Sequence, residues 1–232
     1  DGESFFKYLK QNGYATGSAG TICSKDSLFA DELDLPNVDY EKYDHENVAL
    51  FCDRNYYDTG YSLINGINSV IHRCLYGKEG YQYAFEYAEL FWNSYKENNK
   101  FFRLHIYESH ELTLELIKYA DNNIYNFFKN FIDKGYLNDT LLLLVSDHGN
   151  NMIGFYNILQ VEDYVIEKTL GTWFMILPKK INIDEKFIEI NQQRVVSPYD
   201  IYDTLLDIFG YKLEDNVFSR KGKSVFNKIN LI

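Results

Sequence analysis

The sequence has few basic residues for its length and no cluster of them. Its 232 residues contain 23 Lys and Arg against 34 Asp and Glu, which gives a net charge of −11. A protein that binds nucleic acid or an anionic membrane surface normally carries a basic patch, so both are poor candidate partners. With 46% hydrophobic and 25% charged residues, the chain has the composition of a globular protein rather than a disordered one.

The sequence also lacks a long apolar run and a starting methionine. Its longest apolar runs cover residues 141–145 and 173–177, whereas a membrane-spanning helix needs roughly 20 residues. No membrane span is therefore expected in this chain. The chain begins at Asp1 without a signal peptide, so we expect a processed product, an excised domain or a fragment.

Cysteine and proline are scarce, with 3 residues of each. Cys52 and Cys74 could form a disulfide that leaves Cys23 free or bonded outside the chain, or all three could be buried thiols. Asn138 begins the sequence Asn-Asp-Thr, a glycosylation acceptor that has meaning only in a secreted or lumenal protein. These residues alone leave the compartment open.

What the chain does contain is helices that alternate with short apolar strands. Apolar residues at helical spacing predict helices over 2–11, 81–98, 117–134 and 197–210. Nearly continuous apolar runs predict strands over 101–107, 140–145 and 172–177. The acidic stretch 31–61 predicts an irregular surface excursion. The alternation predicts an α/β fold with a mainly parallel sheet, in which residues 1–232 form one domain or a large part of one.

The strand predicted at 140–145 runs directly into Ser146-Asp147-His148-Gly149. Functional groups collect at the carboxyl ends of the strands in such sheets. A carboxylate oxygen and an imidazole nitrogen are good ligands for Zn²⁺ or Mn²⁺, whereas Ca²⁺ takes oxygen ligands only. The residues alone leave two interpretations in balance. Asp147 and His148 could bind a metal ion, or Asp147 could cap the next segment while His148 makes a loop hydrogen bond.

The strand predicted at 101–107 ends close to His110. This imidazole could donate a hydrogen bond to a substrate oxyanion or leaving group, or it could be only a polar loop residue. His105 lies within the strand and is expected to be a structural histidine. The same interpretation applies to His45 and His72.

The sequence around these strand ends resembles a known superfamily. Ser-Asp-His-Gly at 146–149 follows a run of leucines, and the similarity extends over the lead-in at 135–140, the segment 166–173 and the helix at 197–206. These segments resemble the alkaline phosphatase and sulfatase superfamily. Five further segments are most similar to its animal sulfatase-like family, domain of unknown function 229, namely 51–53, 73–77, 100–104, 108–111 and 164–168. The resemblance runs from about residue 1 to residue 211.

The resemblance implies a sulfatase-like α/β fold, a mainly parallel sheet flanked by helices, of which residues 1–232 are the C-terminal portion. The family's nucleophile and its acidic metal ligand belong to a segment that would precede Asp1, so no residue here is assigned as nucleophile. The resemblance implies that Asp147 and His148 hold one divalent ion, with Zn²⁺ or Mn²⁺ favoured and Ca²⁺ an alternative. Two-metal relatives carry Asp four residues before the histidine corresponding to His110, and here that position is Ile106, which cannot coordinate.

The expected function is therefore a metal-dependent hydrolase or transferase that acts on anionic phosphate or sulfate esters and is inactive as this fragment. In this hypothesis His110 binds the substrate oxyanion or assists the leaving group. The family resemblance also implies a secreted, extracellular or secretory-lumen location, in which a Cys52–Cys74 bridge and a glycan at Asn138 would both be compatible.

Two alternatives stand beside this expectation. The first is a catalytically inactive sulfatase-like domain that serves as an extracellular binding or interaction module. It is favoured by Ala19-Gly20, which stand where the family pattern carries Glu-Asp. The second is an incomplete gene product that lacks the first strand of its sheet and exposes an unpaired edge, which would promote aggregation.

Overall fold

The computed structural model describes residues 2–3, 5–21, 38–39, 43–47, 49–52, 74–110, 115–149, 162–179, 181, 183–211, 221–227 and 229. The strands of this part are β1 (Gly2–Glu3), β2 (Ala15–Gly20), β3 (Val38–Asp39), β4 (His45–Asn47), β5 (Cys74–Leu75), β6 (Lys78–Glu79), β7 (Lys100–His105), β8 (Leu142–Val145) and β9 (Trp173–Ile176). The helices are α1 (Phe5–Gln11), α2 (Gly80–Ser94), α3 (Leu116–Asp133), α5 (Glu162–Thr169), α6 (Glu185–Asn191) and α7 (Pro198–Phe209), with 3₁₀ turns η1 (Ala49–Cys52) and η2 (Tyr136–Asn138). The α/β class is confirmed.

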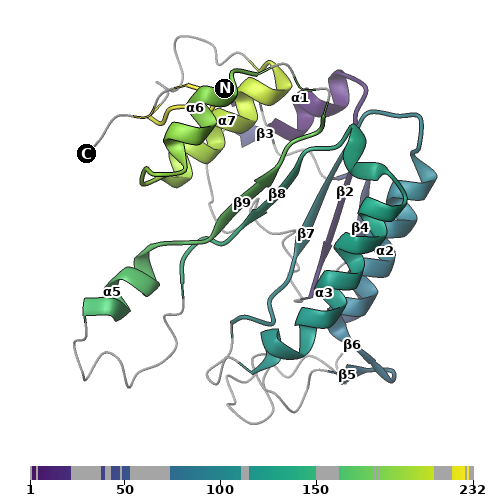
Figure 1. The fold of residues 1–232 in the computed structure, drawn as a ribbon. Helices are drawn as coiled ribbons and strands as arrows, with labels where there is room; N and C mark the ends of the chain where they lie inside the picture. The colour runs from purple at the N-terminus through teal and green to yellow at the C-terminus, as the bar shows by residue number, and fades with distance from the viewer. Residues whose placement is uncertain are drawn as a thin grey trace.

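Three parallel strands in the order β4-β2-β7 form the sheet at the centre of the molecule (Figure 1). The central strand, β2, was not predicted from the sequence. It reads Ala-Thr-Gly-Ser-Ala-Gly and is buried from Thr16 to Gly20. A strand made of small residues carries none of the large β-branched or aromatic side chains by which strands are recognised.

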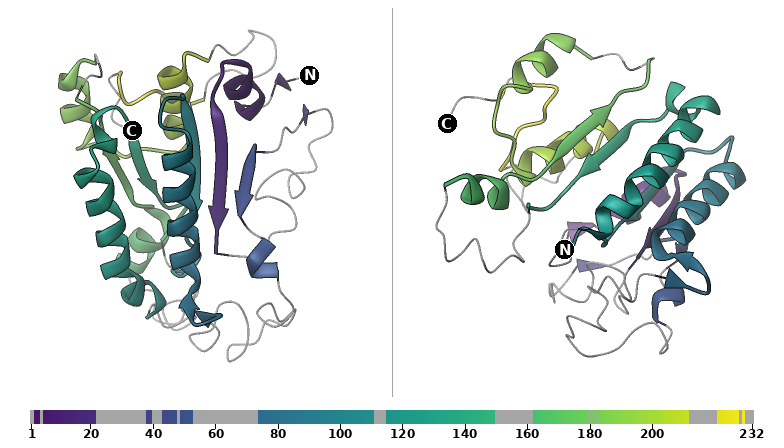
Figure 2. Two further views of the ribbon diagram at one scale, coloured as in Figure 1. Left: turned by 90° about the vertical axis from the view of Figure 1, so that its right-hand side faces the viewer. Right: turned by 60° about the horizontal axis from the view of Figure 1, so that its bottom comes forward.

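The small residues of β2 let helix α2 approach the sheet closely. A Cβ atom on Gly17 would lie 2.6 Å from the ring of Phe102 and 2.8 Å from the ring of Phe91. Any larger residue would therefore push α2 away from β2. Helices α2 and α3 run side by side along this face (Figure 2). Their inward side chains form the main core, made of Tyr81, Phe85, Ala88, Ala120, Phe127 and Phe131.

Helix α1, near the start of the chain, packs against helix α7, which lies far along the sequence, through aromatic side chains. The ring of Phe5 lies edge-on to the ring of Phe209, with 5.3 Å between centroids, and the Tyr8 hydroxyl donates to the Phe209 carbonyl at 3.1 Å. Helix α7, predicted over 197–210, is capped at both ends. Ser197 accepts the Asp200 N–H at its start, and Gly210 has a φ of +66° at its end, a conformation that glycine adopts without strain.

Strands β8 and β9 form a separate antiparallel pair, in which Leu142 lies opposite Ile176 and Val145 opposite Trp173. Figure 1 shows this pair beside β7 and diverging from it. The expectation that 140–145 is buried in a parallel sheet is therefore wrong, because Leu144 and Val145 are 45% and 46% exposed. A continuous apolar run has no periodicity that reports which of its faces is covered.

The structure also bears on the predicted helix ends, on membrane spans and on the cysteine pairing. Helix α2 ends at Ser94, earlier than predicted, and α3 matches its predicted range within a residue. No helix in the described ranges combines the length and apolar character needed to cross a membrane. Cys74 is an exposed free thiol, so the Cys52–Cys74 bridge is not formed. Cys23, His72 and most of the predicted excursion at 31–61 lie outside the described residues.

Candidate functional site

The carboxyl ends of β2, β7 and β8 lie at the same end of the molecule (Figure 1). Thr21 follows β2, the segment from His105 to His110 follows β7, and Ser146 to Gly149 follow β8. Titratable side chains that are distant in the sequence are thereby collected at one edge, as expected for α/β sheets. This edge is the candidate functional site.

The end of β8 is held by its antiparallel partner. The Ser146 N–H donates to the Thr172 carbonyl at 2.9 Å, and the Thr172 N–H donates to Ser146 Oγ at 2.6 Å. Gly171 allows this close approach, because a Cβ atom there would lie 2.5 Å from the Ser146 carbonyl oxygen. The backbone next to Asp147 is therefore held in place by Gly171 and Thr172, the two residues that lead into β9. Sequence reasoning did not assign this supporting role to Gly171.

Asp147 and His148 lie against each other at the tip of this strand. Asp147 Oδ2 is 3.4 Å from His148 Nε2, and Asp147 Oδ1 accepts the His148 N–H at 3.0 Å. The other ring nitrogen, Nδ1, is 2.5 Å from the Gly149 carbonyl oxygen. Because a carbonyl can only accept, Nδ1 carries the proton and Nε2 is the nitrogen that can ligate. The Asp147 side chain is 88% exposed.

This geometry fits two neighbouring ligands of one metal ion. Two atoms bound at about 2.0–2.2 Å to a tetrahedral ion lie about 3.4 Å apart, which is the separation of Asp147 Oδ2 and His148 Nε2. Metal-binding histidines usually donate their second ring N–H to a carbonyl or carboxylate, as His148 does to Gly149. A complete site needs further ligands, and the described residues hold no group of three His, Cys, Asp or Glu side chains around one point.

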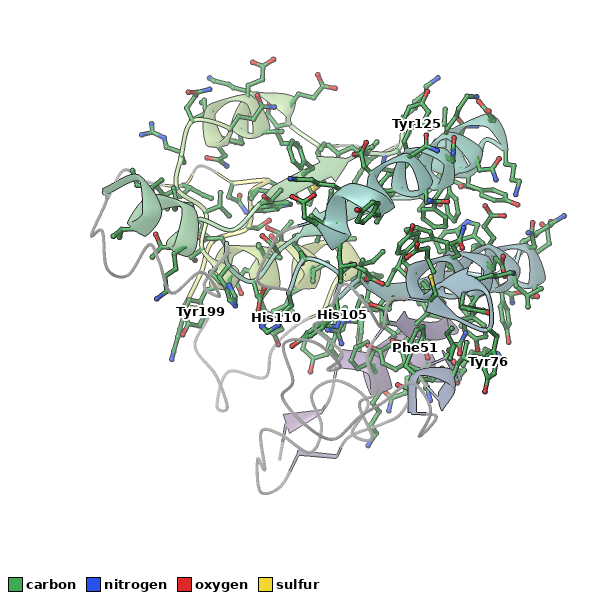
Figure 3. The ribbon with its side chains drawn as sticks, turned by 90° about the horizontal axis from the view of Figure 1, so that it is seen from below. Phe51, Tyr76, His105, His110, Tyr125 and Tyr199 are labelled. Atoms are coloured by element: carbon green, nitrogen blue, oxygen red, sulfur yellow. The ribbon has the colours of Figure 1, made fainter. Side chains whose placement is uncertain are left out.

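The end of β7 carries two histidines on either side of a tyrosine. Figure 3 shows His105 and His110 near each other, and both rings contact Tyr107, with His110 stacked on it at 4.6 Å. The Nδ1 atoms of both histidines are buried without a hydrogen-bond partner among the described residues. Such atoms are costly unless a ligand or water satisfies them. These two nitrogens are therefore the unsatisfied polar atoms at the end of β7 among the described residues.

Asp147 acts electrostatically on the end of β7. Burial and the nearby Arg103 cation lower the pKa of His105, whereas the negative charge of Asp147 works in the opposite direction. The charge of Asp147 at the end of β8 thus acts on His105 at the end of β7, although the two strands belong to different sheets. His45 lies apart from this edge on β4, where its Nε2 makes a hydrogen bond with the Tyr95 hydroxyl and its ring contacts Phe91.

Glu108 is the titratable residue of this edge that sequence reasoning did not assign. Its carboxyl Oε2 accepts a hydrogen bond from Thr21 Oγ1 at 2.8 Å. Burial raises the pKa of Glu108 from 4.5 to about 7, and the charge of Glu79 adds to that shift, while hydrogen bonds from Thr21 and the backbone oppose it. An acid directly after a strand was visible in the sequence, but its burial depends on β2.

A sheet of parallel strands with helices packed on it defines an α/β protein, and the polar residues at the ends of its strands form a candidate site. The family model described as "Protein of unknown function (DUF229)" matches residues 3–230, so the chain belongs to this family. No curated protein and no solved structure matches the chain. The family resemblance is thereby confirmed, and the match carries no information on the wider superfamily.

Proposed function

We propose that the protein is a metal-dependent hydrolase or transferase acting on phosphate or sulfate esters, with an alkaline-phosphatase/sulfatase-like fold. The observation that carries this proposal is the pairing of Asp147 Oδ2 and His148 Nε2 at 3.4 Å, with the imidazole tautomer set by the Gly149 carbonyl. Zn²⁺ and Mn²⁺ suit this oxygen and nitrogen pair better than Ca²⁺ does.

The side chains of the site have separate roles in this proposal. Asp147 and His148 hold the ion, and further ligands and the nucleophile come from outside the described residues. A bound divalent ion polarises the ester oxygen and lowers the pKa of the attacking group. His110 donates a hydrogen bond to the oxyanion or to the leaving oxygen. A cation at this edge also offsets the repulsion that an anionic ester meets from a chain of net charge −11.

The location that accompanies this proposal is the secretory pathway or the extracellular space. Asn138, the glycosylation acceptor, is exposed at the end of η2, where an attached glycan would point into solvent.

Metal binding tests the proposal directly. The longest natural form of the protein is titrated with Zn²⁺ and with Mn²⁺ against a chromophoric chelator, as wild type and as the double variant Asp147→Ala, His148→Ala. We expect one ion per chain in wild type and at least a hundredfold weaker binding in the double variant. Asp121→Ala, which removes an exposed carboxylate from α3, is the matched control and should bind as wild type. Retention of the ion by the double variant would overturn the assignment.

Turnover then separates the reaction classes. Aryl phosphate, phosphodiester and aryl sulfate substrates are offered to the metal-loaded protein. Hydrolysis of at least one class, lost in the double variant, supports the proposal, and the preferred class identifies phosphorus or sulfur as the reacting centre.

A non-catalytic interaction module is the second candidate. It is favoured by apolar side chains that remain exposed on β8, β9 and α5, namely Leu144, Val145, Val165, Ile166, Phe174 and Ile176. Exposed apolar patches are typical of protein-binding surfaces. Binding of the metal ion without turnover of any ester class would favour this candidate over the enzyme.

A further inference from the structure

Thr21 is a hydrogen-bond junction between the ends of β2 and β7. Its N–H donates to the His105 carbonyl at 3.1 Å, which continues the parallel pairing one residue beyond β2. Its hydroxyl oxygen accepts the Tyr107 N–H at 2.8 Å and donates its single proton to Glu108 Oε2 at 2.8 Å. One side chain therefore fixes two consecutive residues that lie 86 and 87 positions away in the sequence.

His110 is held by a hydrogen bond and a ring contact to Tyr107, the residue whose N–H is bound by Thr21. The His110 N–H donates to the Tyr107 carbonyl at 2.9 Å. The His110 ring stacks on the Tyr107 ring, with centroids 4.6 Å apart and planes 27° apart. Tyr107 is in turn tied to β2 through its own N–H. A loss of the Thr21 junction would free the turn that carries His110.

Glu108 lies on this junction in surroundings that favour an uncharged carboxyl group. Partial burial removes hydration that the ionised group would need, and no cation of the described residues offsets this loss. Among the described residues, Glu79, the residue before α2, carries a negative charge that disfavours a second carboxylate nearby. From β2 it meets the uncharged Thr21 hydroxyl, and its neighbours along the chain are Tyr107 and, two residues on, His110. These contacts raise its pKa to about 7.

We propose that Thr21 and Glu108 are positioning residues for His110, and that Glu108 performs this role as a neutral carboxylic acid. When Glu108 releases its proton to solvent, the buried carboxylate is better solvated outside the junction, so the turn from Tyr107 to His110 loosens. The catalytic consequence rests on the proposed function, whereas the positioning itself does not.

Amide hydrogen exchange tests the positioning independently of any reaction. We expect the Tyr107 and His110 amides to exchange at least tenfold faster in Thr21→Val than in wild type, after correction for intrinsic exchange. Thr21→Ser keeps the hydroxyl and should preserve protection. In wild type, protection of both amides should fall as pH rises from about 4.5 to 7 and level off above that range, and in Glu108→Gln, which stays uncharged, that fall should vanish. Unchanged protection in Thr21→Val, or an unchanged pH effect in Glu108→Gln, would overturn the proposal.

Turnover by the metal-loaded full protein provides the second readout. We expect kcat of wild type to fall as pH rises from about 4.5 to 7 and to level off above that range, and that of Glu108→Gln to lack this fall, with KM altered less than twofold. Thr169→Val and Glu97→Gln are matched controls, because the hydroxyl of Thr169 donates to carbonyls of its own helix, α5, and Glu97 is exposed. If no ester is turned over while the amide effects are present, the proposed function fails and the positioning role stands. If turnover is present and Glu108→Gln keeps the fall of wild type, the positioning role fails and the proposed function stands.

Discussion

The ends of β7 and β8 lie at the same edge of the molecule but are built in opposite ways. The β7 end is tied to β2 through Thr21, and the carboxyl group of Glu108 is buried there. The β8 end is tied to β9 and, through the Gly149 N–H and the Lys168 carbonyl at 3.2 Å, to α5, and Asp147 is 88% exposed.

This difference matches what each end is proposed to do. A group that binds an anion or assists a leaving group must be held in one orientation beforehand, because reorganisation at the moment of reaction is costly. A pair of metal ligands needs accessible lone pairs, and the bound ion itself adds order. We infer that the β7 end is preorganised and that the β8 end is completed by what it binds.

The largest expected effect tests whether stability is concentrated on the β7 side. Phe127 is 8% exposed and stacks on Phe85 at 4.7 Å between α3 and α2, whereas Phe174 on β9 is 65% exposed. Phe127→Ala should lower the free energy of unfolding by about 4 kcal/mol, because a buried phenyl ring is replaced by a cavity. Phe174→Ala should cost about 0.5 kcal/mol or less. Urea denaturation measures both, and similar losses for the two variants would contradict the comparison.

The next effect concerns pH. Because the pKa of Glu108 is about 7 in the folded protein and 4.5 ordinarily, the folded state binds more protons than the unfolded state between these values. Stability should therefore fall as pH rises from about 4.5 to 7 and then level off, by on the order of 3 kcal/mol in total. Unfolding free energies measured across this range should lose that slope in Glu108→Gln.

The control for the pH prediction is an exposed carboxylate away from both strand ends. Glu97→Gln removes such a group and should keep the slope of wild type. Asp44 contributes at lower pH. Burial alone would raise its pKa, but hydrogen bonds from Thr16 and the Lys10 ammonium bring it below 3.8. Its contribution is therefore lost only as pH falls through that lowered pKa. A slope that persists in Glu108→Gln would show that another group carries it.

The smallest effect concerns the support of Asp147. Gly171→Ala would place a Cβ atom 2.5 Å from the Ser146 carbonyl oxygen and displace the end of β8. We expect divalent-ion binding to weaken about tenfold, which is about 1.4 kcal/mol. Gly222→Ala is the matched control, because its Cβ atom would lie 2.2 Å from the Tyr199 backbone, beside α7. It should lower stability without changing ion affinity, and equal ion affinity in wild type and Gly171→Ala would exclude a supporting role for Gly171.

Part of the fold could be predicted because its signals are local. The cap of α7 is complete within four residues, from Ser197 to Asp200, and Gly135, with a φ of +73°, directly follows the helix predicted over 117–134. Strand β2 was not predicted because its residues are small. Small residues are needed there because α2 packs closely against the strand. The partner and direction of β8 were wrong because a run of leucines does not specify which strand it pairs with.

The candidate site divides in the same way. Asp147 and His148 are adjacent, so their pairing could be proposed from the sequence. Thr21 and Glu108 are 87 residues apart, and no local pattern connects them. The burial that makes Glu108 unusual exists only after β2 and β7 have paired.

The sequence by itself determined the α/β alternation, the helix caps and the adjacency of the Asp147 carboxylate and the His148 imidazole, because each depends on residues within one or two turns of chain. Only the tertiary structure decided that β8 pairs with β9 and that Gly171 lies against the Ser146 backbone beside Asp147. The same holds for the hydrogen bonds by which Thr21 connects β2 to Tyr107 and Glu108. The physical reason is that hydrogen-bond pairing and desolvation arise between distant segments, so they take effect only when the chain has packed.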